Sequence, residues 1–94
     1  MKITVLMTAS LRKEVALTLV RCDEKRLLEG HVISTNHLTR ELNSNEFRSK
    51  EWDPFEVSIA MTDLGFEMAV TPVTNFRGWK VEREKVLSLL QQDN

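Results

Sequence analysis

Five polar residues in segment 35–40 have side chains that can hydrogen-bond to a nucleic acid. Asparagine can pair with adenine, and arginine with guanine, through two parallel hydrogen bonds. Each such pair discriminates against a wrong base by about 1–3 kcal/mol. Leu38 and Leu42 lie four residues apart, which predicts a helix over 35–43 with an inward apolar face and an outward polar face. The candidate base contacts are Thr35, Asn36, His37, Thr39 and Arg40. The same pattern is also typical of an ordinary solvated helix face.

Three further cations are candidates for contacts with phosphates. Arg48 and Lys50 stand between Phe47 and Trp52, and Arg77 precedes a second tryptophan by two residues. Neutralisation of phosphates supplies much of the affinity of DNA-binding proteins. We therefore expect the three cations to contact a DNA backbone, whereas large aromatic side chains such as Phe47 and Trp52 more often fill the core.

Other kinds of chemistry lack a recognisable site. Cys22, His31 and His37 do not have the spacing of metal ligands, and structural zinc requires four of them. The three glycines, at 30, 65 and 78, are too far apart for a phosphate-binding loop. We expect no enzymatic activity, no metal and no cofactor. Cys22 is the only cysteine, so an intrachain disulfide is impossible, which suits a cytoplasmic protein.

Three segments resemble parts of small bacterial winged helix-turn-helix domains, of the excisionase-like and MerR-like kinds. Segment 32–43 is similar to the turn and second helix of a helix-turn-helix. Segment 57–65 is similar to a strand ending in Leu-Thr-x-x-Gly, and segment 77–90 to a wing exit and last helix. The helix-turn-helix positions are occupied by Ile33, Ser34, Leu38, Thr39, Arg40, Leu42 and Asn43.

This resemblance implies an order of elements and a function. The order is helix, helix, recognition helix, wing and closing helix, which would place helices at 10–22, 23–30 and 35–43 before a wing. The function implied is that of a small bacterial or phage DNA-binding regulator of transcription. Such a protein docks its recognition helix in the major groove of double-stranded DNA and usually binds as a dimer.

Periodicity predicts the elements of the C-terminal half. Phe55, Val57, Ile59 and Met61 alternate with polar or small residues, and a similar alternation follows the turn at 63–65. Period-two alternation is typical of strands, so an antiparallel β-hairpin is expected at 55–73. Apolar residues spaced three and four apart predict a C-terminal helix at 81–92, which could also join two copies in a homodimer.

Residues 10–30 allow two interpretations. Leu11, Val15 and Leu19 have helical spacing, but segment 14–20 is rich in branched residues and also alternates. It could instead form an N-terminal β-hairpin at 2–20 in a mixed antiparallel sheet. A helix over 10–22 favours the DNA-binding interpretation. A strand there favours a non-enzymatic protein-binding module, such as an inhibitor, an immunity-type protein or an accessory subunit.

Length and composition fit one small α+β domain over residues 1–94. The net charge of -1 lacks the strong basic excess common in DNA-binding domains. The positive charge is mildly concentrated, because residues 1–52 carry nine Lys/Arg against seven Asp/Glu. No apolar run approaches the roughly 20 residues needed to span a bilayer, so no membrane association is expected.

Overall fold

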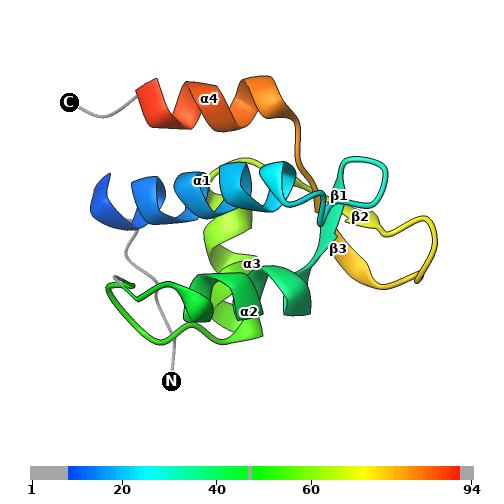
Figure 1. The fold of residues 1–94 in the computed structure, drawn as a ribbon, viewed down its shortest axis with the longest axis horizontal. Helices are drawn as coiled ribbons and strands as arrows, with labels where there is room; N and C mark the ends of the chain where they lie inside the picture. The colour runs from blue at the N-terminus through cyan, green and yellow to red at the C-terminus, as the bar shows by residue number, and fades with distance from the viewer. Residues whose placement is uncertain (1–8, 47, 92–94) are drawn as a thin grey trace.

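Four helices and one three-stranded antiparallel sheet make up residues 9–46 and 48–91, the part of the chain that the computed structural model describes (Figure 1). This arrangement confirms the predicted α+β class. In chain order the elements are α1 (Ala9–Glu24), β1 (Val32–Ser34), α2 (Thr35–Ser44), α3 (Pro54–Asp63), β2 (Glu67–Val70), β3 (Arg77–Lys80) and α4 (Arg83–Gln91).

The sheet has the strand order β1-β3-β2, and both contacts are antiparallel. β2 and β3 form a hairpin, and β3 also pairs with β1 so that Ser34 lies opposite Gly78. The two backbones approach closely at this point, because a Cβ on Gly78 would lie 2.2 Å from the carbonyl oxygen of Ile33. A residue without a side chain is therefore required where β1 meets β3.

The prediction of a hairpin at 55–73 is wrong in its first half, where the chain forms α3. Asp53 is the N-cap and Pro54 begins the helix. Asp53 and Glu56 form a capping box, in which each side chain accepts a hydrogen bond from the other residue's backbone N–H. Gly65 does take a positive φ, of 86°, but it ends the helix instead of turning a hairpin. The real hairpin runs from 67 to 80, around a loop at 71–76.

The N-terminal half contains one long helix and a strand. α1 extends from Ala9 to Glu24, so the alternative β-hairpin at 2–20 is wrong for residues 9–20, and residues 1–8 lie outside the described part. The predicted helix at 23–30 is also wrong. α1 ends there because Arg26 adopts a left-handed φ of 59° and Leu27 N–H donates to the carbonyl of Cys22 at 2.9 Å, a Schellman-type end. A tight turn at Gly30 and His31 then leads into β1.

The other two helix predictions are confirmed. The helix expected at 35–43 is α2, and Ser34 caps it by accepting a hydrogen bond from the backbone N–H of His37 at 3.1 Å. The helix expected at 81–92 is α4, although position 92 lies outside the described residues. Its Val86 and Leu89 are buried, as their spacing predicts.

The connection between α2 and α3 is held by two polar side chains. The amide of Asn43 accepts a hydrogen bond from the backbone N–H of Trp52 and donates one to its carbonyl, both at 2.7 Å. Glu14 of α1 accepts the indole N–H of Trp52 at 2.7 Å and the backbone N–H of Ser49 at 2.9 Å. Trp52 is buried, as expected, whereas Phe47 lies outside the described residues.

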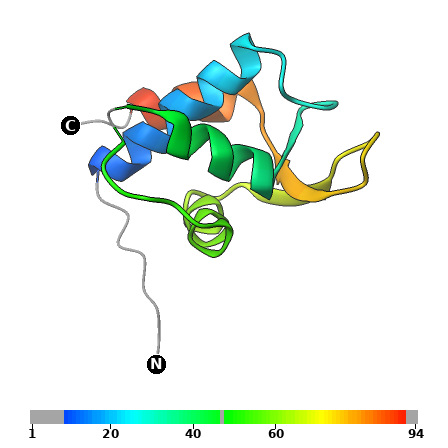
Figure 2. The same cartoon turned by 60° about the horizontal axis from the view of Figure 1, so that its bottom comes forward.

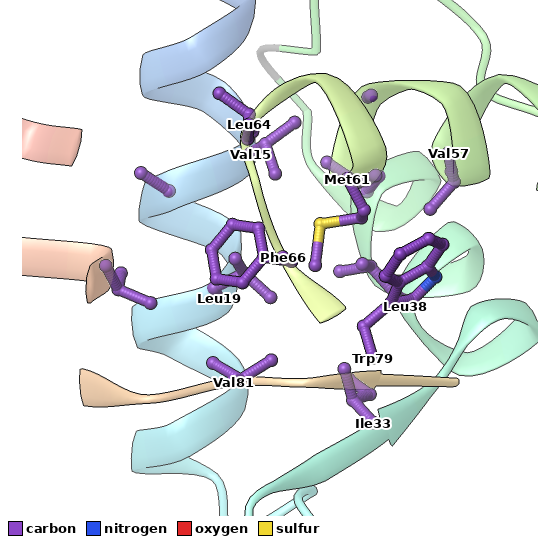
Figure 3. Packing of buried hydrophobic residues seen from close by; sticks show 14 of the residues in the cluster. Val15, Leu19, Ile33, Leu38, Val57, Met61, Leu64, Phe66, Trp79 and Val81 are labelled. Carbon is purple, nitrogen blue, oxygen red and sulfur yellow. The ribbon is translucent and has the colours of Figure 1, made fainter. Parts of the chain in front are cut away.

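The helices enclose a single apolar core against one face of the sheet. α1 lies between α4 and α2, and the sheet stands at the end of the molecule where α1 ends (Figures 1 and 2). Met61 of α3 lies between Phe66 and Trp79 of β3 in the centre of this core (Figure 3). The most deeply buried apolar side chains from the helices are Val15, Ala16, Leu19, Cys22, Leu38, Leu42, Val57, Ala60 and Met61.

Candidate nucleic-acid interface

A groove of about 210 Å³ separates the start of α2 from the far end of the β2–β3 hairpin. The loop before β1 and the hairpin loop project from the same end of the molecule, beside the N-terminus of α2 (Figures 1 and 2). We call this depression the α2–hairpin groove. It is lined by Leu27, Glu29, Val32, Ser34, Asn36, His37, Arg40, Thr71, Thr74 and Phe76.

Three of the predicted base contacts lie together in this groove. Asn36 and Arg40 are exposed and stand one helical turn apart, and His37 beside them is half-buried. α2 turns its other face inward through Leu38 and Leu42. The predicted division of this helix into an apolar and a polar face therefore holds at these positions.

The two predicted threonines point elsewhere and serve the fold. Thr35 Oγ1 accepts a hydrogen bond from the indole Nε1 of Trp79 at 3.1 Å. Thr39 is buried, and its hydroxyl donates to the carbonyl of Thr35 at 2.7 Å. Neither hydroxyl belongs to the lining of the α2–hairpin groove, because both are engaged within the domain.

The predicted phosphate contacts are scattered. Arg48 and Lys50 follow the C-terminus of α2, beyond the end of the helix away from the groove, and neither lines it. Arg48 donates to the carbonyl of Asn45 at 3.2 Å, and Lys50 pairs with Glu56. Arg77 is exposed at the start of β3, directly after the hairpin loop.

One carboxylate stands on the wall of the groove. Glu29 Oε2 accepts hydrogen bonds from the backbone N–H and the hydroxyl of Thr74, at 3.4 and 3.3 Å. It thereby ties the loop before β1 to the hairpin loop and fixes the width of the groove. The negative charge of Glu29 would repel an anion from that wall, so a bound phosphate would lie nearer to Arg40.

The helix α3, which was predicted as the first strand of a hairpin, has an exposed acidic residue at each end. Asp53 and Asp63 are exposed at its two ends, and Asp63 is 3.6 Å from the guanidinium of Arg12. Phe55 is also exposed, at 58%. The sequence signal for this helix was present in the spacing of Asp53 and Glu56, which is that of a capping box.

Comparisons with protein-family models, with curated proteins and with solved structures found no match. Among the described residues, no cluster of three or more histidine, cysteine or acidic side chains could hold a metal ion. No helix in that same part of the chain is long and apolar enough to cross a bilayer. The site must therefore be judged on its own geometry.

A second, larger cavity of about 550 Å³ lies between α1 and α4. Its lining is mainly aliphatic, with Leu19, Val86 and Leu87 among the residues, and His31 and Arg83 also line it. None of the residues predicted to bind DNA lines it. Cys22 is buried nearby in α1, and burial raises the pKa of its thiol to about 12, with the negative charge of Glu41 as a smaller cause.

Proposed function

We propose that this protein binds double-stranded DNA through the α2–hairpin groove and regulates transcription by occupying a site, without catalysis. The observation that carries the proposal is the grouping of Asn36, His37 and Arg40 on one surface of α2. Asn and Arg are the side chains best suited to reading adenine and guanine. Nearby, Arg77 offers a cation for the phosphate backbone. A cytoplasmic location fits a regulator of this kind.

The order of elements also supports a winged-helix interpretation. Three helices (α1, α2 and α3) precede a hairpin and a closing helix, as in the winged helix-turn-helix order. The helix that holds the third place is α3, not the predicted 35–43 segment. A helix over residues 10–22 was the feature expected to favour DNA binding over a protein-binding module, and α1 covers them.

Electrostatics favours α2 and the hairpin over α3 as the surface that receives the duplex. Phosphates repel carboxylates, and α3 is flanked by the exposed Asp53 and Asp63. The exposed surface of α2 beside the groove carries Asn36 and Arg40 and no exposed acid. We therefore place the duplex along the first two turns of α2, with the hairpin loop beside it.

Fluorescence anisotropy with a random duplex tests this proposal. Binding at low salt should weaken steeply as salt rises, because each phosphate contact releases counterions. Arg40→Ala should weaken binding and reduce the slope of log K against log salt by about one. Arg83→Ala is the matched control, because it removes the same charge from α4, outside the groove lining. Equal losses in the two variants, or no binding at low salt, would refute the proposed surface.

A protein partner is the second candidate, and the exposed apolar side chains favour it. Val73 and Phe76 of the hairpin loop are 84% and 60% exposed, and Phe55 adds a third large side chain. Contiguous exposed apolar side chains, such as neighbouring residues of one loop, are typical of protein-binding surfaces. Val73→Ser, outside the groove lining, should abolish capture of the partner under this alternative, whereas it should leave DNA affinity almost unchanged if the protein binds DNA.

We also propose, as a finer point, that the C-terminal helix contributes to a homodimer. Leu87 of α4 is 45% exposed, although Val86 and Leu89 are buried within the domain. The apolar surface of α4 that stays exposed is small. Sedimentation of Leu87→Glu alongside the wild-type protein tests it, since unchanged association would exclude this helix.

A further inference from the structure

We propose that β2 docks a second copy of this chain, whose own β2 pairs with it antiparallel across a twofold axis. The sheet order β1-β3-β2 makes β2 an edge strand. Its Met68 and Val70 are 66% and 52% exposed. An exposed edge with apolar side chains is a template for another strand. This inference goes beyond the proposed function, because it places an interface between two copies at the β2 edge and not at α4.

The hydrogen-bonding pattern shows which backbone groups face the open edge. Thr71 N–H donates to the carbonyl of Phe76 at 2.9 Å, so this pair belongs to the hydrogen-bonded type. The two types of pair alternate along an antiparallel ladder. Positions 67 and 69 therefore bond to β3, whereas Met68 and Val70 direct their N–H and C=O groups outward. The residues with exposed apolar side chains are thus also those whose edge groups pair with no strand in the described part of the chain.

This edge is complementary to itself. When Ala69 lies opposite Ala69 of the second copy, Met68 of each copy lies opposite Val70 of the other. Both of these pairs can exchange two main-chain hydrogen bonds, and both place apolar side chains side by side. Glu67 then lies opposite Thr71, so the one charged residue of β2 meets no like charge.

The size of the edge sets the strength of association. Stable interfaces bury roughly 800 Å² on each partner, and a four-residue strand buries far less. We therefore expect a dimer with a dissociation constant on the order of 100 µM. Formation of the dimer desolvates no acidic or basic side chain of β2 apart from Glu67, which lies at the strand end.

Sedimentation equilibrium over a wide concentration range tests the dimer. Met68→Lys places a charge in the centre of the edge and should raise the dissociation constant by roughly tenfold or more. Val73→Lys is the matched control, because Val73 is exposed on the hairpin loop outside the paired residues. A strict monomer at millimolar concentration would overturn the proposal. So would a dimer that Met68→Lys leaves intact, since its interface would lie elsewhere.

Crosslinking tests the register of the pair. In a non-hydrogen-bonded pair the opposed Cα atoms lie about 4.5 Å apart, within the range of a disulfide. In a Cys22→Ala background, Ala69→Cys should form an intermolecular disulfide in a glutathione redox buffer, with oxidised glutathione as the electron acceptor. Glu67→Cys is the control, because position 67 faces position 71 of the other copy. Equal rates for the two variants would overturn the proposed pairing.

Discussion

The indole Nε1 of Trp79 donates a hydrogen bond to the hydroxyl of Thr35, 3.1 Å away. Trp79 belongs to β3 and Thr35 is the first residue of α2, so this bond fixes the helix against the sheet. It holds the N-terminus of α2 in place beside the hairpin. The contact gives Thr35 a structural role that its type and position alone do not reveal, and its base contact stays a prediction.

Replacing Thr35 by Val should destabilise the domain. The substitution keeps the shape of the side chain but leaves the N–H of Trp79, which is 2% exposed, without an acceptor. A buried donor left unpaired costs about 1–3 kcal/mol of unfolding free energy. Chemical denaturation measures the loss. Thr35→Ser keeps the hydroxyl and should lose less, so equal losses in both variants would contradict the role of this bond.

Replacing Gly78 by Ala should disrupt the contact between β1 and β3. The added Cβ would lie 2.2 Å from the backbone oxygen of Ile33, which cannot move without shifting the strand. Overpacking against a backbone costs at least about 2–3 kcal/mol.

Gly30→Ala is the comparison for Gly78→Ala. Gly30 has a φ of 54° and its nearest neighbour is the end of the Pro72 ring at 3.1 Å. The cost there should be about 1–2 kcal/mol, from the left-handed backbone alone. Thermal unfolding measures the stability of both variants. If Gly78→Ala is as stable as Gly30→Ala, or more stable, then β1 and β3 do not approach closely at Gly78.

The stability of the domain should fall between pH 9 and pH 12 because of Cys22. Its folded pKa of about 12 lies above the ordinary value of 9.0, so the folded state retains a proton that the unfolded state has lost. The unfolding free energy is therefore unaffected below pH 9 and decreases above it, by up to about 1.4 kcal/mol per pH unit. Denaturation from pH 8 to 10.5 should show a steeper decline in the wild-type protein than in Cys22→Ala. Parallel curves would contradict this account of the thiol.

Local sequence patterns correctly predicted the helices in which the spacing of apolar residues fits only a helical period. α2 and α4 are amphipathic with no competing period. In α3 the apolar residues fit both periods. Alternation at 55–61 suggested a strand, but the buried residues Val57, Ala60, Met61 and Leu64 follow helical spacing. The capping box and Pro54 decide in favour of the helix, and Phe55 remains exposed as a result.

The candidate site was only partly predictable, because its second wall comes from far along the chain. Asn36, His37 and Arg40 share a helix surface that spacing alone reveals. Thr74 and Phe76 reach the same groove only through the pairing of β1 with β3. The strand β3 could not be located while residues 55–62 were assigned to the hairpin. The wall of the groove that the true hairpin forms was therefore not predicted.

The most direct test of the central claim is an NMR titration of the ¹⁵N-labelled protein with duplex DNA at low salt. Amide signals of Asn36, His37, Arg40 and Arg77 should shift first and most, and the shifts should vanish as salt is raised, because charge contacts are screened. Absence of shifts, or shifts concentrated on α3 and the β2 edge, would contradict the proposal that α2 and the hairpin receive the duplex.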